Sequence, residues 1–369
     1  MRVLVLNGGS SSLKAGVFDV PRDSEEAEPG KAVWSKEVSI DAPEAASRLL
    51  DSVDTMDVEA VGHRIVNGGK SFAEPERITP EVKKALRELA QAAPQHNQLE
   101  MAGIEAAERK FGRDMPQVAV FDSAFHATMP PEAYTYPGPS AWIDQGIRRF
   151  GFHGISHRYV SRRAARMLGR PVEELKLITC HLGGGCSLAA VSGGRSVDTT
   201  MGFTPLEGLM MGTRSGSVDP GILIYLMRKG CRADDLDRTL NRESGLKGLA
   251  GSSDMREVVA AAGRGEERAR LALDVFVHKL CSGMGAMLAS LGGLDGLVFT
   301  GGIGENAPLV RERACKQFGF LGVRIDKEAN DRGAEGDVSV AGSAVRVMVI
   351  PTAEDWEVAR GTRRVVKRF

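Results

Sequence analysis

Two stretches of the chain share one pattern of apolar and polar positions. Residues 3–19 alternate as a strand, break at a glycine-serine stretch and resume at residue 13. Residues 178–191 repeat this design, with a break at three consecutive glycines. Each stretch therefore predicts two strands joined by a glycine-rich turn. Sliding one stretch onto the other by 175 positions (183 − 8) pairs Gly8 with Gly183, Gly9 with Gly184, Ser12 with Ser187, Leu13 with Leu188 and Ala15 with Ala190.

A second correspondence lies later in each half. Residues 118–122 match residues 296–300 at an offset of 178 (296 − 118). Two matches at nearly the same offset predict that the chain contains an internal duplication.

Helical patterns separate the strands. Thr79-Pro80 and Asp219-Pro220 each place a capping residue before a proline, which is typical of a helix start. A long helix is expected over residues 265–291 and a terminal helix over residues 354–367, with strands at 297–300 and 345–350. The side chains expected to face inward on the long helix are Leu271, Val275, Leu280, Met284 and Leu288, and Met287 is also expected in the core.

Strands that alternate with helices in two similar halves predict an α/β protein with a cleft between the halves. The chain has 369 residues, more than one core usually holds. We expect an N-terminal domain of residues 1–124 plus 356–369 and a C-terminal domain of residues 125–355. Residues 21–43, rich in Pro, Glu, Asp and Ser, are expected to form a surface hairpin or loop.

Composition narrows the function classes. Lysine and arginine number 48, as do aspartate and glutamate, so no basic excess points to nucleic acid. The five cysteines show no C-x-x-C spacing, which favours a reducing compartment over a disulfide framework or a zinc site. No uncharged apolar stretch approaches the ~20 residues of a membrane span, and the N-terminal run is too short for a signal peptide. We expect a soluble, cytoplasmic protein.

Three glycine-rich segments are candidates for phosphate binding, because glycine lets backbone N–H groups approach phosphate oxygens. They are residues 7–14 (NGGSSSLK), 181–185 (HLGGG) and 301–306 (GGIGEN). The first is neither a P-loop nor a dinucleotide fingerprint, because a strand follows it. The alternative for that segment is an ordinary hairpin whose serines cap its own backbone. The third precedes a helix that we expect to begin after Ala307, a geometry that suits a nucleotide.

Cationic side chains accompany these segments. Arg64 lies just before Gly68-Gly69, and Arg214 is flanked by small residues in an apolar stretch, which is unusual for a solvated arginine. Such residues would neutralise a carboxylate and a phosphoryl group, although a structural ion pair is the alternative. His153 lies between two glycines, and as a lone feature it would be a core histidine. His157 follows four residues later, but no third ligand for zinc is evident.

These residues together resemble the acetate kinase family, within the superfamily of acetate and sugar kinases, heat-shock proteins and actin. The matching motifs are NGGSSSLK at 7–14, GHRIVNGG at 62–69, FDSAFHATMPP at 121–131, RFGFHGISH at 149–157, ITCHLGGGCS at 178–187, MGFTPLEGLMMGTRSGSVDPG at 201–221, GIGEN at 302–306 and PTAED at 351–355. The resemblance implies two duplicated ribonuclease-H-like domains, the first with the substrate and phosphate hairpin and the second binding the nucleotide in the cleft.

The resemblance also implies roles for individual residues. Asp122, His153 and Arg214 would be catalytic, and Arg64 would bind the substrate carboxylate. Mg²⁺, for which Mn²⁺ may substitute, would be held by Asn7 and Glu354. The acyl pocket would be lined by Val66, Phe152 and Pro205. The nucleotide site (ATP or ADP) would comprise Lys14, His181, Leu182, Gly183, Gly184, Gly185, Asp254, Met255, Arg256, Gly302, Ile303, Gly304, Glu305 and Asn306.

Three positions depart from the family pattern. Gly184 replaces an asparagine in the second glycine-rich segment, and Ala353 replaces an asparagine beside Glu354. Gln95 replaces a leucine, which makes the preferred acid uncertain.

The implied reaction is reversible, direct in-line transfer of a phosphoryl group from ATP to a short-chain carboxylate, acetate first and propionate next, in a homodimer. Two alternatives stay open. A sugar kinase of the same superfamily would need an aspartate base for a neutral hydroxyl. A non-catalytic nucleotide-binding protein would keep the glycine-rich turns and lose the arginines, both of which are present here.

Overall fold

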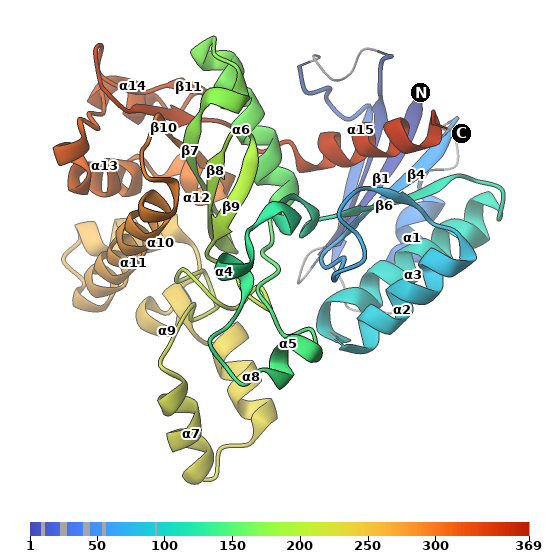
Figure 1. Cartoon of the computed structure of the whole chain (residues 1–369), viewed down its shortest axis with the longest axis horizontal. Coiled ribbons are helices and arrows are strands. Elements are labelled where there is room, and N and C mark those ends of the chain that lie inside the picture. Colours follow the sequence, from blue (N-terminus) through green and yellow to red (C-terminus); the bar gives the residue numbers. More distant parts are fainter. Residues whose placement is uncertain (9–11, 23–27, 40–44, 54–56, 93, 369) are drawn as a thin grey trace. The chain divides into compact units, whose positions relative to one another are not determined.

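The chain consists of two compact units in the computed structural model (Figure 1). The structure describes residues 1–8, 12–22, 28–39, 45–53, 57–92 and 94–368, without the side chains of residues 45 and 90–98. Unit 1 comprises Met1–Ala127 and Ala353–Phe369, and unit 2 comprises Thr128–Thr352. Glu354, expected in the C-terminal domain, therefore belongs to the first unit.

Unit 1 is built on a six-stranded sheet with the strand order β3-β2-β1-β4-β6-β5. Its strands are β1 (Arg2–Gly8), β2 (Ser12–Asp19), β3 (Trp34–Ser39), β4 (Ala60–Ile65), β5 (Glu76–Arg77) and β6 (Gln117–Phe121). Its helices are α1 (Ala45–Asp51), α2 (Pro80–Ala92), α3 (Pro94–Phe111) and α15 (Glu354–Val366). β1 and β2 form the predicted antiparallel hairpin, while β1, β4 and β6 run parallel.

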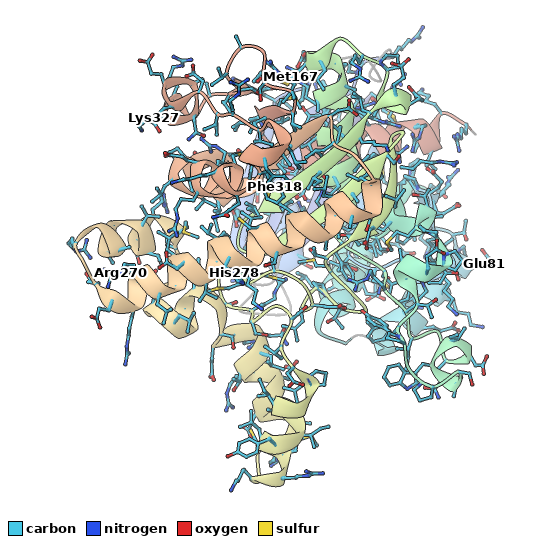
Figure 2. The ribbon with its side chains drawn as sticks, turned by 60° about the vertical axis from the view of Figure 1, so that its left-hand side comes forward. Glu81, Met167, Arg270, His278, Phe318 and Lys327 are labelled. Carbon is cyan, nitrogen blue, oxygen red and sulfur yellow. The ribbon has the colours of Figure 1, made fainter. Side chains whose placement is uncertain are left out.

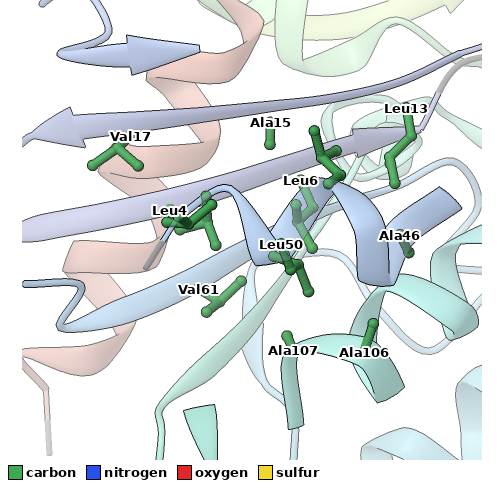
Figure 3. Packing of buried hydrophobic residues seen from close by; sticks show 12 residues of the cluster. Leu4, Leu6, Leu13, Ala15, Val17, Ala46, Leu50, Val61, Ala106 and Ala107 are labelled. Atoms are coloured by element: carbon green, nitrogen blue, oxygen red, sulfur yellow. The ribbon is translucent and has the colours of Figure 1, made fainter. Parts of the chain in front are cut away.

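The two faces of this sheet carry different helices. Figure 3 shows the cluster on one face, where Leu4 and Val61 of the sheet pack with Leu50 of α1 and Ala107 of α3. The next residue of β4, Gly62, points the other way, because successive side chains alternate along a strand. A Cβ at Gly62 would lie 2.3 Å from the hydroxyl oxygen of Thr362, so only glycine lets α15 approach this closely.

Unit 2 repeats the design with the strand order β11-β12-β10-β7-β8-β9. Its strands are β7 (Lys176–Leu182), β8 (Cys186–Ser192), β9 (Arg195–Thr199), β10 (Gly296–Thr300), β11 (Gly336–Asp337) and β12 (Arg346–Val349). Its helices are α4 (Pro131–Tyr134), α5 (Ala141–Asp144), α6 (Gly154–Leu168), α7 (Pro220–Arg228), α8 (Ala233–Arg242), α9 (Gly245–Ala250), α10 (Met255–Gly263), α11 (Glu267–Leu291), α12 (Gly301–Asn306), α13 (Pro308–Gln317) and α14 (Lys327–Arg332). Short 3₁₀ helices span Ala124–Thr128, Val172–Glu174 and Gly319–Leu321.

The strand orders confirm the predicted duplication and correct one of its details. In both sheets the hairpin strands lie side by side, and the first of them pairs with a parallel strand, β4 in unit 1 and β10 in unit 2. The counterpart of β10 is therefore β4. The predicted match of residues 118–122 (β6) with residues 296–300 (β10) is wrong, because buried parallel strands share an apolar pattern whatever their place in a sheet.

The long helix α11 covers one face of the second sheet. Leu280, Met284 and Met287 are buried as predicted, whereas Leu271 is exposed and the expectation for it is wrong. Among the described residues α11 alone is long and apolar enough to cross a membrane by length and composition, a test that core helices also pass. It contacts β7, β8 and β9, and its exposed side carries Arg270 and His278 (Figure 2), so we assign it to the core.

The acidic segment at residues 21–43 was expected to form a surface hairpin or loop, and its described part agrees with the hairpin. Residues 34–39 form the edge strand β3, which pairs antiparallel with β2. The parts of this segment at 23–27 and 40–43 lie outside the described residues.

Candidate active site

In unit 1, three parallel strands end at the same edge of the sheet. The end of β1 carries Asn7, the end of β4 carries Arg64, and Asp122 directly follows β6. The carboxyl ends of adjacent parallel strands are the usual location of a ligand site in an α/β sheet. The strand register thus brings together three residues that are 57 or more positions apart in sequence.

Arg64 is the centre of this group. Its Nη2 donates to Asp122 Oδ2 at 2.8 Å, and its Nη1 donates to the Gly8 carbonyl at 3.2 Å and to Asn7 Oδ1 at 3.4 Å. Asp122 is fully buried. The guanidinium is therefore fixed by packed partners, as recognition of a carboxylate requires.

The start of α15 adds further charged groups beside Arg64. Asp355 accepts from Asn7 Nδ2 at 2.7 Å and pairs with Lys14 Nζ at 2.8 Å. Glu354 Oε1 is buried and has no hydrogen-bond partner among the described residues. Burial raises the pKa of Glu354 to about 7, and the nearby carboxylates Asp122 and Asp355 raise it as well.

These oxygen groups fit a magnesium ion. A buried carboxylate oxygen without a partner, crowded by other carboxylates, gains most from a divalent cation. Within the described residues no group of three or more His, Cys, Asp or Glu side chains is arranged to hold a metal. Mg²⁺ typically takes one or two carboxylates and completes its shell with water and phosphate oxygens, so this result is compatible with the fit.

Sequence reasoning missed Glu100 of α3. Its carboxylate is buried and accepts a hydrogen bond from the backbone N–H of Val66 at 2.6 Å. Burial raises the pKa of Glu100 to about 8, while the Val66 N–H and the charge of Arg64 lower it. The sequence signal was a lone glutamate among apolar and amide residues, which does not show that the residue is buried.

In unit 2, the parallel strands β7 and β10 end beside a cavity of about 800 Å³. Its lining consists of Gly183, Gly184, Ser253, Asp254, Met255, Arg256, Val259, Gly302, Ile303, Asn306, Ala307, Pro308 and Leu309. This volume lies within the usual range for small-molecule and cofactor sites. Ser253, Val259 and residues 307–309 were not anticipated from the sequence.

The other residues expected in the nucleotide site are not part of this lining. Leu182 and Gly304 are buried, and Glu305 Oε1 accepts from the backbone N–H groups of Gly301 and Thr352. Lys14 belongs to unit 1. Asp254, which does line the cavity, caps the start of α10, and the hydrogen bond from Arg256 lowers its pKa to about 2. The third glycine-rich segment is itself helical, as α12, rather than a turn.

His153 and Arg214 lie next to the β7–β8 turn. A Cβ built on Gly185 would be 3.2 Å from His153 Nε2 and 3.3 Å from Arg214 Nη1, so both side chains reach the same point. Arg214 Nη1 donates to the Pro205 carbonyl at 3.1 Å. His153 stacks on His181 with ring centroids 4.2 Å apart. It is also the only non-glycine residue of the described chain with a positive φ (56°), a strained conformation typical of functional sites.

The remaining expected residues divide between the units. Val66 lies in unit 1, while Phe152, which is buried, and Pro205 lie in unit 2. Gly184 opens onto free space, with nothing within 4 Å of a Cβ built on it. Ala353 precedes α15 and makes no side-chain cap. The side chain of Gln95 lies outside the described residues.

Two repeated α/β units, each with charged groups or a cavity at the ends of its parallel strands, define a two-domain phosphotransferase. The model of the acetokinase family matches residues 35–360. An acetate kinase from Gloeobacter violaceus is 52% identical over 399 residues, covering 98% of each chain. The chain belongs to the acetokinase family, and it is an enzyme that transfers a phosphoryl group to a carboxylate.

Solved structures agree with this assignment. An acetate kinase from Porphyromonas gingivalis superimposes with a TM-score of 0.89 at 38% identity, covering 99% of each chain. A propionate kinase from Francisella tularensis superimposes with a TM-score of 0.90 at 35% identity, again over 99% of each chain. The similarity therefore spans both units.

Proposed function

We propose that the chain transfers the terminal phosphoryl group of ATP to acetate and forms acetyl phosphate and ADP. The observation that carries the proposal is the presence of a fixed arginine in each unit of an acetokinase-family chain: Arg64 in unit 1 and Arg214 in unit 2. A carboxylate and a transferring phosphoryl group are both anionic, so a carboxylate kinase needs cations for each.

In unit 1, Arg64 binds the carboxylate of the substrate. Acetate is already ionised at neutral pH, so the attacking oxygen needs no general base. Asp122 acts through its ion pair, because its carboxylate holds the guanidinium of Arg64 in place. The residues assigned to the acyl group are Val66 of unit 1 and Phe152 and Pro205 of unit 2.

In unit 2, the cavity beside the β7–β8 turn takes the nucleotide. Gly183 and Gly184 present backbone groups to the phosphates, while His153 and Arg214 donate to the transferring phosphoryl group as negative charge develops. Lys14 exchanges its ion pair with Asp355 for an ion pair with a phosphate of the nucleotide. The transfer is direct and in line, and it is reversible because acetyl phosphate is itself a good phosphoryl donor.

Asn7 and Glu354 would hold the magnesium ion, with Asp122 nearby. Glu354 supplies the carboxylate oxygen that has no partner among the described residues. Bound there, the cation would supply positive charge to the phosphate oxygens. Mn²⁺, which also prefers oxygen ligands, would replace it.

A sugar kinase is the competing assignment within this fold. It would use an aspartate to remove a proton from a neutral hydroxyl, but Asp122 is fully buried and its carboxylate is paired with Arg64. A non-catalytic nucleotide-binding protein would have no need of two arginines fixed at strand ends and loops. Both alternatives therefore account for these residues less well than carboxylate phosphorylation does.

We further propose that the enzyme is a cytoplasmic homodimer. All five cysteines are free, which suits a reducing compartment. Four large apolar side chains of α7 are roughly half exposed, and a second copy of the chain is the partner that would cover them. They are Ile222, Ile224, Tyr225 and Met227.

The test is an assay of ADP formation with acetate, propionate, butyrate, glycolate and a panel of hexoses. We expect acetate to give the highest kcat/KM and propionate to follow closely, because one methylene changes binding in an apolar pocket by only about 1–3 kcal/mol. Turnover of a hexose without turnover of any acid would overturn the proposal. A preference for glycolate would indicate that Gln95 or another polar side chain faces the acyl group.

A further inference from the structure

A chain of buried hydroxyl and imidazole groups lies behind His153. Its Nδ1 is 2.9 Å from the hydroxyl oxygen of Ser187, which is 2.8 Å from Nε2 of His157. The Nδ1 of His157 is in turn 2.7 Å from the hydroxyl oxygen of Thr179. Three side chains thus connect His153 to the interior of the second sheet.

All of these groups lie on one face of that sheet. Thr179 is paired with Ala189, and His181 with Ser187, in the β7–β8 ladder, so their side chains project on the side covered by α6. Ser187, His157 and Thr179 are fully buried, whereas His153 is partly exposed. Of the four side chains in this hydrogen-bond chain, only His153 is therefore accessible to solvent.

Thr179, at the buried end of this hydrogen-bond chain, sets the direction in which each hydrogen bond is donated. The hydroxyl of Thr179 donates to the carbonyl of Ala189 at 3.5 Å, a long bond that still uses its one proton. Thr179 therefore accepts from His157 Nδ1–H. With Nδ1 donating, the Nε2 of a neutral His157 accepts from the hydroxyl of Ser187. The single hydroxyl proton of Ser187 is then used in the bond to His157, so Ser187 accepts from His153 Nδ1–H.

We propose that Thr179, His157 and Ser187 are positioning residues that hold a proton on Nδ1 of His153. Nε2 then donates to the phosphoryl group only when His153 is an imidazolium. This inference rests on the proposed function for the part that concerns the phosphoryl group. Together with Arg214, the site then presents two positive charges at the point next to Gly185.

The proton position can be observed directly by ¹⁵N NMR of the histidine-labelled full-length protein, which has seven histidines. We expect a protonated Nδ1 for His153, assigned with a His153→Gln variant. In Thr179→Val, His157 loses its acceptor at Nδ1. We therefore expect the chain to reverse, with His157 donating from Nε2 and His153 carrying its proton on Nε2. A neutral Nε2–H tautomer of His153 in the wild type overturns the proposal.

The kinetic test compares two buried threonines of the same sheet. Thr199 of β9 donates to the carbonyl of Leu188 and does not belong to the chain. We expect Thr179→Val to lower kcat at least tenfold, with KM for ATP and for acetate changed less than twofold, because binding groups stay in place. Thr199→Val should lose a similar amount of stability and keep its kcat. Equal kcat values for both variants would mean that Thr179 serves packing alone.

The two kinds of failure are distinguishable. If the wild type phosphorylates no carboxylate, the proposed function fails while the NMR result still decides the proton position. If the wild type is active and the proton lies on Nε2, the function stands and the inference fails. Should Thr179→Val not fold, Ser187→Ala breaks the same chain one step closer to His153, and the same loss of kcat is expected.

Discussion

Two neighbouring glycines of the β7–β8 turn leave very different room for a side chain. Gly184 has open space and a backbone conformation that other residues adopt, because its φ is not positive. We expect Gly184→Asn to lower KM for ATP by roughly tenfold, since one hydrogen bond to a charged group is worth about 1.5–3 kcal/mol. Calorimetric titration with ATP and steady-state kinetics measure this change.

Gly185 supplies the contrast for that experiment. A Cβ there would meet His153 and Arg214 at 3.2–3.3 Å, which is tight enough to displace them. Gly185→Ala should therefore lower kcat while leaving KM for ATP near the wild-type value. If Gly184→Asn binds ATP no better than the wild type, Gly184 does not face the phosphates.

Glu100 predicts a pH dependence of stability. Its pKa is raised from 4.5 to about 8 in the folded state, so the folded protein holds a proton that the unfolded chain releases in this window. The stability that it contributes is full below pH 4.5 and is lost as the pH rises through 8. Glu100→Gln remains neutral and still accepts from Val66. Its free energy of unfolding relative to the wild type should rise between about pH 5 and pH 9, by roughly 4–5 kcal/mol at most.

Denaturant unfolding over a pH series measures this difference. Glu105→Gln is the matched control, because Glu105 lies on the same helix and is partly exposed, where it pairs with Arg87. Its stability difference from the wild type should not depend on pH. A pH-independent difference for Glu100→Gln would mean that Glu100 is ionised in the folded protein.

At the scale of elements, a fully buried arginine secures the short helix α12. Arg311 donates to the carbonyls of Gly304 and Glu305 at 2.8 Å and to Asn330 Oδ1 at 2.7 Å. Arg311→Met leaves these buried acceptors without donors, so we expect a loss of about 3–5 kcal/mol in the free energy of unfolding. ATP affinity should fall as well, because α12 lines the cavity.

Arg313→Met is the control for this prediction. Arg313 lies on the same helix α13, is partly exposed and pairs with Asp274. Its loss should change stability by about 0.5 kcal/mol or less. Similar stability losses for Arg311→Met and Arg313→Met would show that Arg311 is not a principal support of α12.

The sequence predicted elements where local chemistry decides them. The two glycine-broken hairpins formed as expected, and Asp219 accepts from the backbone N–H of Gly221 at the start of α7. The prediction that β6 and β10 are equivalent strands of the internal repeat was wrong, because apolar periodicity identifies a buried strand but not its place in a sheet. The prediction that Leu271 is buried was wrong for a related reason, since an apolar residue near a helix end is not always covered by another element.

For the whole molecule, motifs predicted candidate site residues but not how their side chains are held. Arg64 and Asp122 were expected from their flanking sequences, yet their ion pair depends on the register of β4 and β6. Glu100 and the partners of His153 carry no motif of their own. Such supporting residues are defined by packing across elements, which sequence spacing does not encode.

The association state belongs to this scale too. If α7 forms a contact between copies, the wild type should sediment at twice the 39.5 kDa chain mass. A double variant, Ile224→Glu with Met227→Glu, places two charges on neighbouring positions of α7 and should shift the protein to monomers. Gln317→Glu, at an exposed position of α13, is the control. If the double variant stays dimeric, the contact between copies does not involve α7.

The central claim is that an arginine in each unit serves the chemistry of a carboxylate kinase, and Arg214 tests it most directly. Arg214 donates to two neutral groups, the carbonyl of Pro205 and the sulfur of Met211. The measurement is kcat/KM for ATP-dependent formation of acetyl phosphate by the wild type and by Arg214→Ala, with thermal unfolding of both. We expect a loss of roughly 10²–10³-fold, equivalent to about 3–4 kcal/mol, with an unchanged Tm. A value of kcat/KM near that of the wild type in a normally folded variant would contradict the account.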